Sequence, residues 1–236
     1  FDYALLDHIE VYNVKEFSAA SKPLEYIGQD GDTKPFLNRN IKIPGFTFPL
    51  ELKPGGASLI LFKIQTEGAR YSNVRLVTGR GLAESESTSS LGLGLYFGGL
   101  VVLSLYTLVL FCFMRSVPYL IFFGLVSMMT LFFAAEAGLI SQYVSPRDPI
   151  WANLFFLLGL SGITFMGFWL NLVFLRKTLS PREQWIHGVL IGCSGFNFLL
   201  CFGTSYVVVS RIGLGLIMLY MVTSCWLSVR AWLLGY

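Results

Sequence analysis

Residues 91–140 read LGLGLYFGGLVVLSLYTLVLFCFMRSVPYLIFFGLVSMMTLFFAAEAGLI and contain two long apolar runs, Leu91–Met114 and Pro118–Ile140. Each run exceeds the ~20 residues that cross ~30 Å of hydrocarbon at about 1.5 Å per helical residue. Neither run alternates as a barrel strand does, and helices and closed barrels satisfy their own backbone groups in lipid. Because only residues 115–117 connect the runs, the second helix must return antiparallel beside the first. The sequence therefore predicts a transmembrane helical hairpin.

The whole chain has the composition of a membrane protein. Of its 236 residues, 54% are hydrophobic and 13% are charged, and the mean hydropathy is +0.64. Residues 1–90 hold 11 acids and 10 bases, whereas residues 91–236 hold 3 acids and 7 bases. The first part thus has the balance of a soluble domain. The basic excess lies beside the apolar runs, where it favours lipid headgroups as its partner and argues little for nucleic acid, so we expect no nucleic-acid partner.

Further apolar runs predict five spans in this chain. Besides about 91–114 and 118–140, the expected spans cover about 150–175, 185–203 and 212–229. The connections after the first, third and fifth spans hold five bases, and the other two hold only Arg147 and Arg211. Basic loops stay on the cytoplasmic side, so residues 1–78 lie outside the cytoplasm. In a Gram-negative cell this orientation means the inner membrane, with the N-terminal domain in the periplasm.

Residues 1–78 have the pattern of short β-strands. Gly45–Leu52 alternates between apolar and polar side chains, which indicates a strand, and Pro49 indicates an edge or a bulge there. Strands without intervening helices favour an all-β sandwich or jelly roll. Four or five strands would make only part of one, so we expect the first strands to precede Phe1 in a longer protein. The other expected strands centre on Ile9 and Val11, on Ile60, Phe62 and Ile64, and on Val74 and Leu76.

Residues 79–90, GRGLAESESTSS, separate the β domain from the first span. They are polar and show no periodicity, so we expect a flexible linker.

Several short phrases resemble a known receptor family. The β part contains LDHIEVY at Leu6–Tyr12, Gly31-Asp32 and Arg39, and the first span contains LYFGG at Leu95–Gly99. These phrases are similar to those of bacterial seven-transmembrane receptors with diverse intracellular signalling modules. The resemblance implies an extracellular jelly roll like a carbohydrate-binding module. It also implies two further spans and a cytoplasmic output domain, a histidine kinase or a diguanylate cyclase, beyond this chain.

A loop of the β domain gathers charged residues that suit ligand binding. Carboxylate and basic side chains of this kind bind a ligand's carboxylate or sugar hydroxyl groups. The bland interpretation is a solvated turn, and no aromatic platform for a sugar accompanies the loop. The candidate residues are Asp30, Asp32, Lys34 and Arg39.

Polar residues inside the expected spans form a second group of candidates. Glu136 is the only carboxylate within a span, and intramembrane carboxylates usually face the bundle interior. It lies near the outer end of its span, which also fits an interfacial role. Asn171 and Asn197 are expected to hydrogen-bond between helices. His187, beside Trp185, is expected at the headgroup boundary.

Gly94 and Gly98 form a GxxxG pair in the first span, which permits close helix packing. We expect packing within the chain, with homodimerisation as the alternative. All four cysteines fall within apolar runs, so we expect buried thiols without a disulfide.

No catalytic constellation is visible in the sequence. It contains no nucleophile paired with a base, no metal-ligand spacing and no phosphate-binding loop, so we expect neither a metal nor a cofactor. The leading hypothesis is a sensory receptor whose outer β domain binds a small molecule, a carbohydrate or a protein. The alternatives are a transporter or membrane-embedded enzyme with an accessory β domain, and a structural scaffold.

Overall fold

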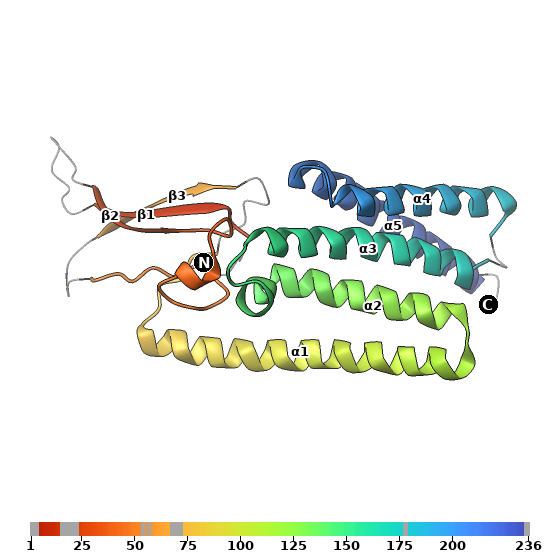
Figure 1. Ribbon diagram of the computed structural model, residues 1–236, viewed down its shortest axis with the longest axis horizontal. Helices are drawn as coiled ribbons and strands as arrows, with labels where there is room; N and C mark the ends of the chain where they lie inside the picture. The colour runs from red at the N-terminus through yellow and green to blue at the C-terminus, as the bar shows by residue number, and fades with distance from the viewer. Residues whose placement is uncertain are drawn as a thin grey trace. The chain divides into compact units, whose positions relative to one another are not determined.

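The computed structural model describes residues 5–14, 24–52, 55, 58–66, 73–176 and 179–233. The chain divides into two compact units (Figure 1). The first unit comprises Phe1–Leu82 with Ala134–Ala152, and the second comprises Ala83–Phe133 with Asn153–Tyr236.

The first unit contains a three-stranded antiparallel sheet. Strands β1 (His8–Val14), β2 (Leu24–Asp30) and β3 (Leu59–Gln65) lie in the order β2-β1-β3. The register of β1 against β2 shifts between Val11 and Tyr12, which marks a bulge. The sheet confirms the β character expected for this part of the chain.

One face of β1 forms the core of the β domain. Because side chains alternate along a strand, Ile9 and Val11 point to the same face, and both are fully buried. They pack with Leu6 and Phe46, and burying a side chain of this size stabilises a fold by about 1.5–3 kcal/mol. Partly buried residues complete the cluster: Ile27, Phe48, Ile60 and Ile64.

Two of the expected strands do not form. Gly45–Leu52 makes no ladder, because Pro44 and Pro49 lack the backbone N–H that a ladder requires. The alternation still predicts burial correctly, since Phe46 is fully buried. The strand expected around Val74 and Leu76 is also wrong: both side chains are exposed and residues 73–78 are irregular.

The expected linker is wrong as well, because residues 79–90 belong to helix α1 (Gly79–Met114). Thr78 begins the helix: its carbonyl accepts from Leu82 N–H at 2.8 Å, and its Oγ1 accepts from Gly81 N–H at 3.2 Å. The apolar run provides the costly helix nucleus, and each further residue then adds a hydrogen bond at little cost. The helix therefore extends through the polar residues up to the β domain.

Helix α2 (Val117–Glu136) returns beside α1, and the two form the hairpin expected from the sequence (Figure 1). Arg115 turns the chain with a positive φ of 49°. Ser104 and Ser127 hydrogen-bond across the pair at 3.1 Å. A Cβ added to Gly94 or Gly98 would meet no atom within 4 Å among the described residues. The expected packing of this GxxxG pair within the chain is therefore wrong.

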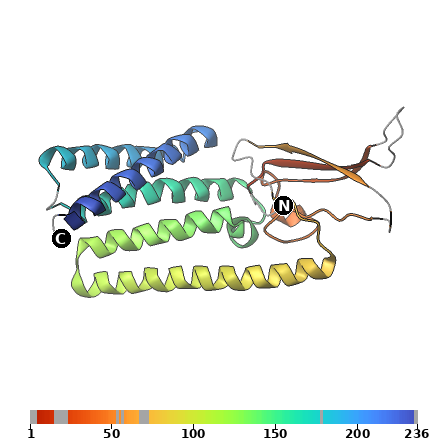
Figure 2. The same cartoon turned by 180° about the vertical axis from the view of Figure 1, so that it is seen from behind.

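Helices α3 (Ile150–Phe174), α4 (Pro181–Leu200) and α5 (Tyr206–Leu233) complete the second unit, and Figure 2 shows α4 beside α5. Within the described residues, α1, α2, α3 and α5 are long and apolar enough to cross a membrane. Helix α4 forms where the fourth span is expected but is less apolar, since its first turn carries Arg182 and Glu183. Its crossing of the membrane stays a prediction.

Glycines let α3 approach its neighbours closely. A Cβ on Gly159 would lie 2.7 Å from the Phe132 backbone of α2, and one on Gly167 would lie 2.6 Å from the Tyr220 ring of α5. Helix α3 is accordingly the most buried of the four apolar helices, with half of its apolar stretch inside the protein.

Candidate functional site

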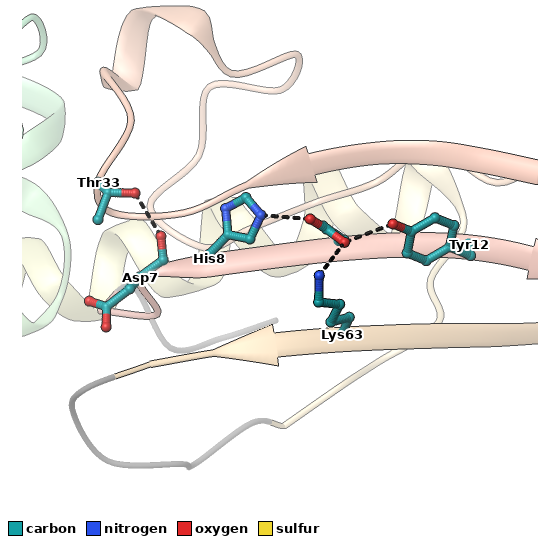
Figure 3. A network of polar contacts seen from close by, with 6 residues as sticks. Asp7, His8, Tyr12, Thr33 and Lys63 are labelled. Atoms are coloured by element: carbon teal, nitrogen blue, oxygen red, sulfur yellow. Dashed lines mark hydrogen bonds and ion pairs between the residues drawn. The ribbon is translucent and has the colours of Figure 1, made fainter.

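The loop after β2 is pinned to the segment that leads into β1. Asp32 N–H donates to the Leu6 carbonyl at 2.8 Å, and the Thr33 hydroxyl donates to the Asp7 carbonyl at 2.8 Å (Figure 3). Immediately before these two residues, Gly31 leaves no space for a side chain, because an added Cβ would lie 2.0 Å from Asp7 O. The loop therefore has a fixed position on the sheet.

Arg39 lies at the centre of this loop. Its guanidinium carbon is 4.9 Å from the Phe36 ring centroid and 4.4 Å from that of Phe46, at cation–π distance. Its Nη1 donates to the carbonyls of Ile43, at 3.3 Å, and Pro44, at 3.0 Å. Its Nε lies 3.7 Å from Asp30 Oδ1.

Burial lowers the pKa of Arg39, and the negative charges of Asp30 and Asp32 oppose that shift. A guanidinium stays charged throughout the accessible pH range, so a buried positive charge is balanced here by neighbouring carboxylates. Removing one partner of such a group leaves the other buried and uncompensated, which is strongly destabilising.

The structure thus brings three of the four loop candidates together. Asp30, Asp32 and Arg39 are all buried, and Lys34, half-buried, lies in the same turn with its N–H 3.3 Å from the Gly31 carbonyl. The solvated turn considered as the bland interpretation is wrong for the three buried residues. The three hold the loop in shape, and ligand binding at this loop stays a prediction.

A second polar cluster surrounds Glu10. Because side chains alternate along β1, this cluster lies on the opposite face of the sheet from the buried Ile9 and Val11. Figure 3 shows His8, Tyr12 and Lys63 of the cluster. Glu10 Oε1 is 2.9 Å from His8 Nε2, and Oε2 accepts from the Tyr12 hydroxyl at 2.7 Å and from Lys63 Nζ at 3.2 Å. The hydrogen bonds from Tyr12, His8 and Lys63 lower the pKa of Glu10 from 4.5 to about 2. The hydrogen bond from the Tyr12 hydroxyl to Glu10 also raises the pKa of Tyr12.

Aromatic rings continue this outer face of the sheet. Tyr12 meets Tyr26 of β2 edge-on, with ring centroids 5.7 Å apart, and Tyr26 is 52% exposed. The face offers a carboxylate, an ammonium group and phenol edges to a polar molecule. Sequence reasoning missed it. The alternating polar residues at 8, 10 and 12 indicate a polar face of β1, but Lys63 joins them only through the register of β3 against β1.

The intramembrane candidates do not form one site. Asn171 Nδ2 donates to Ser224 Oγ at 2.7 Å and links α3 to α5. Asn197 Nδ2 donates to Ser161 Oγ at 2.8 Å and links α4 to α3. Glu136 is the last residue of α2 and is exposed.

His187 is not at a wet boundary as expected. It is 4% exposed, its Nδ1 is 2.9 Å from the Glu183 carbonyl, and its ring meets Phe168 of α3 edge-on. Helix α4 turns the face with His187 toward α3. The nearby Trp185 lies on another face of the helix and is exposed. Among the described residues, no three His, Cys, Asp or Glu side chains gather as a metal site.

Comparison with known families agrees with this arrangement. Residues 89–236 match the family described as 7TM diverse intracellular signalling, and residues 1–78 match the one described as 7TMR-DISM extracellular 2. The chain belongs to the 7TMR-DISM family. No curated protein and no solved structure matches it.

The two matches assign the halves of this 7TMR-DISM chain. The sheet and its polar clusters belong to an extracellular domain, and the apolar helices belong to the membrane region of a receptor. The 7TMR-DISM chain is therefore a membrane protein whose N-terminal domain lies outside. The matches stop at 78 and resume at 89, and helix α1 spans the interval.

Proposed function

We propose that this chain is the sensing and transmitting segment of a bacterial inner-membrane receptor, with its β domain in the periplasm. The observation that carries the proposal is the order of the two matches, an extracellular domain followed directly by a seven-transmembrane signalling region. The output module is a histidine kinase or a diguanylate cyclase on the cytoplasmic side. A stimulus outside then changes the activity of that module.

The stimulus is a small molecule, a carbohydrate or a protein that binds the β domain. A ligand shifts a receptor between two arrangements only by its difference in affinity for them. The loop of Asp30, Asp32, Lys34 and Arg39 suits this role because its buried charges make its packing sensitive to a change beside it. The exposed Tyr26 and Lys63 on the outer face give a ligand direct access to the sheet.

The joints between the two units support transmission through helices. The boundary falls within α1 after Leu82, within α2 after Phe133 and within α3 after Ala152. A displacement of the first unit therefore reaches the second through three hydrogen-bonded helices. The lipid bilayer surrounds the second unit, and homodimerisation through Gly94 and Gly98 stays a prediction.

Orientation is tested by thiol labelling in intact cells. Ser87→Cys should react with a charged, membrane-impermeant maleimide, whereas Ser180→Cys should react only after the cells are opened. The parent chain, with its four native cysteines, gives the background. Labelling of the second variant and protection of the first would reverse the topology and contradict the proposal.

The sensory role is tested by deletion in the full-length receptor. Removing residues 1–78 should change basal phosphorylation or cyclic-di-GMP synthesis, whichever the module performs, because the β domain biases the helices. The matched control is Lys42→Ala, an exposed β-domain substitution that should leave output unchanged. If basal output and the response to a stimulus both stay unchanged after the deletion at equal membrane abundance, the β domain is excluded as the sensor.

A further inference from the structure

A short turn of the β domain meets the connection between α2 and α3. The 3₁₀ turn η1 (Phe36–Asn38) presents the Leu37 N–H, which donates to the Pro146 carbonyl at 3.2 Å. The two residues are far apart in sequence, yet both belong to the first compact unit. The contact therefore adds a non-covalent joint to the covalent one at Thr78, where α1 begins.

The η1 side of this contact has a fixed shape. Asn38 N–H donates to the Pro35 carbonyl at 3.0 Å, and Arg39 N–H donates to the Phe36 carbonyl at 3.2 Å. Phe36 is buried over the Arg39 guanidinium, while Leu37 remains 44% exposed. The buried charges of the loop thus hold η1 in place and leave the Leu37 backbone N–H available to a partner.

The partner segment is equally well defined. After α2, Gly138 adopts a positive φ of 74° and the π-helical turn η2 (Ile140–Val144) follows. Ser145 Oγ then donates to the Asp148 carbonyl at 2.7 Å, and Asp148 Oδ1 accepts from Ile150 N–H at 3.1 Å at the start of α3. Pro146 therefore lies in a turn bonded to the first residue of α3. A displacement of this turn moves that end of the helix.

We propose that the Leu37–Pro146 contact is a coupling joint: the α2–α3 connection is the docking partner of η1, and the state of the β domain reaches α2 and α3 through it. The inference rests on the proposed receptor function, which it deepens by naming the residues that transmit. A rearrangement of Asp30, Asp32 or Arg39 would shift η1 because all three pack around the loop that carries it.

Disulfide trapping in the full-length receptor, in native membranes, tests the joint. The pair Leu37→Cys and Pro146→Cys keeps the backbone N–H and carbonyl that form the bond. A hydrogen bond of this length places the two Cα atoms roughly 5–6 Å apart, within the span of a disulfide. The single variant Leu37→Cys, which keeps the native cysteines at 112, 193, 201 and 225, measures background crosslinking. Leu37→Cys with Arg147→Cys repeats the test with the proline retained.

The matched control is Leu37→Cys with Ser180→Cys, whose second thiol lies in the α3–α4 connection, on the cytoplasmic side of the membrane in the proposed orientation. We expect copper phenanthroline to crosslink the Leu37 pairs with residues 146 or 147 at least tenfold faster than this control. We also expect basal output to change on crosslinking and to return on reduction. Equal crosslinking rates would overturn the contact, and a rapid crosslink that leaves output unchanged would overturn its coupling role.

The two failures are distinguishable. If removal of residues 1–78 leaves basal output and stimulus response unchanged, and the crosslink forms in the intact double-cysteine receptor, the receptor function is wrong. If that deletion alters output while residues 37 and 146 fail to crosslink, the receptor function stands and the joint is overturned.

Discussion

The guanidinium carbon of Arg39 lies 4.4 Å from the centroid of the fully buried Phe46 ring. This relationship joins the charged loop of the β domain to its hydrophobic core. Any change that moves Arg39 therefore disturbs packing beneath the sheet as well as charge pairing with Asp30. A ligand that bound at this loop would therefore also change the stability of the domain.

Replacement of Arg39 by alanine should destabilise the β domain by about 3 kcal/mol, because it leaves Asp30 and Asp32 buried without their cation. Pulse proteolysis of the purified full chain in urea measures this change. The control Lys42→Ala removes an exposed charge and should stay within about 0.5 kcal/mol of the parent chain. Equal stability of both variants would show that the charge of Arg39 does not compensate the buried carboxylates of Asp30 and Asp32.

Gly31→Ala should prevent the loop from closing, since its Cβ would lie 2.0 Å from the Asp7 carbonyl. The matched control is Gly28→Ala, whose Cβ would meet Phe48 at an ordinary 3.5 Å. We expect Gly31→Ala to expose the β domain to protease without denaturant and Gly28→Ala to resist it. Similar resistance of the two variants would contradict the close approach.

The Glu10 cluster should make the β domain sensitive to acid. The pKa of Glu10 falls from 4.5 to about 2 on folding, so its contribution to stability is present above pH 4.5. That contribution is lost as the pH falls from about 4.5 through about 2, because the unfolded chain takes up the proton first.

The urea midpoint of the β domain, followed between pH 6 and 2, measures this effect. The difference between the parent chain and Glu10→Gln should shrink across the stated window. A difference that stays constant with pH would mean that Glu10 titrates normally.

The helical junction predicts that signalling depends on helix phase. Each alanine inserted after Ser87 rotates the β domain by about 100° relative to the rest of α1. Output of the full-length receptor should therefore oscillate over insertions of one to four residues and recover most at four. A steady trend with insertion length would instead indicate the flexible linker that the composition of residues 79–90 suggests.

Asn197→Ala should lower the stability of the helix bundle by about 0.6 kcal/mol, and by no more than about 1.7 kcal/mol, the range found for hydrogen bonds between membrane helices. It removes the bond from Asn197 to Ser161 between α4 and α3. Unfolding of the purified chain in mixed micelles measures the change. Phe196→Leu, at an exposed position of the same helix, is the control.

Hydropathy predicted the hairpin because Leu91–Met114 and Pro118–Ile140 are far longer than any apolar run that a soluble fold needs. It predicted α4 less well. There His187, Ser194 and Asn197 are buried against neighbouring helices, so that polar side chains interrupt the run without facing water. Residues 79–90 were predicted to be a flexible linker because their composition gives no sign that a helix can propagate into them from an adjacent span.

Within the β domain, alternation identified β1, β3 and the buried Phe46 but missed β2. The bulge opposite Val11 and Tyr12 breaks the period of β2, and Gly28 contributes no side chain to the pattern. The candidate site was predicted in part for a similar reason. Asp30, Asp32 and Arg39 are near in sequence, whereas Glu10 and Lys63 meet only once β1 and β3 are in register.

The continuous helix from Gly79 to Met114 has a consequence for how such receptors diverge. A disordered tether tolerates insertions and deletions of any size. In a continuous helix, every added or removed residue rotates one end about the helix axis relative to the other. Lineages should therefore gain or lose residues here in steps that restore the facing, about seven or eleven at a time. Alignments of related receptors should show gaps of these sizes between the outer domain and the first span.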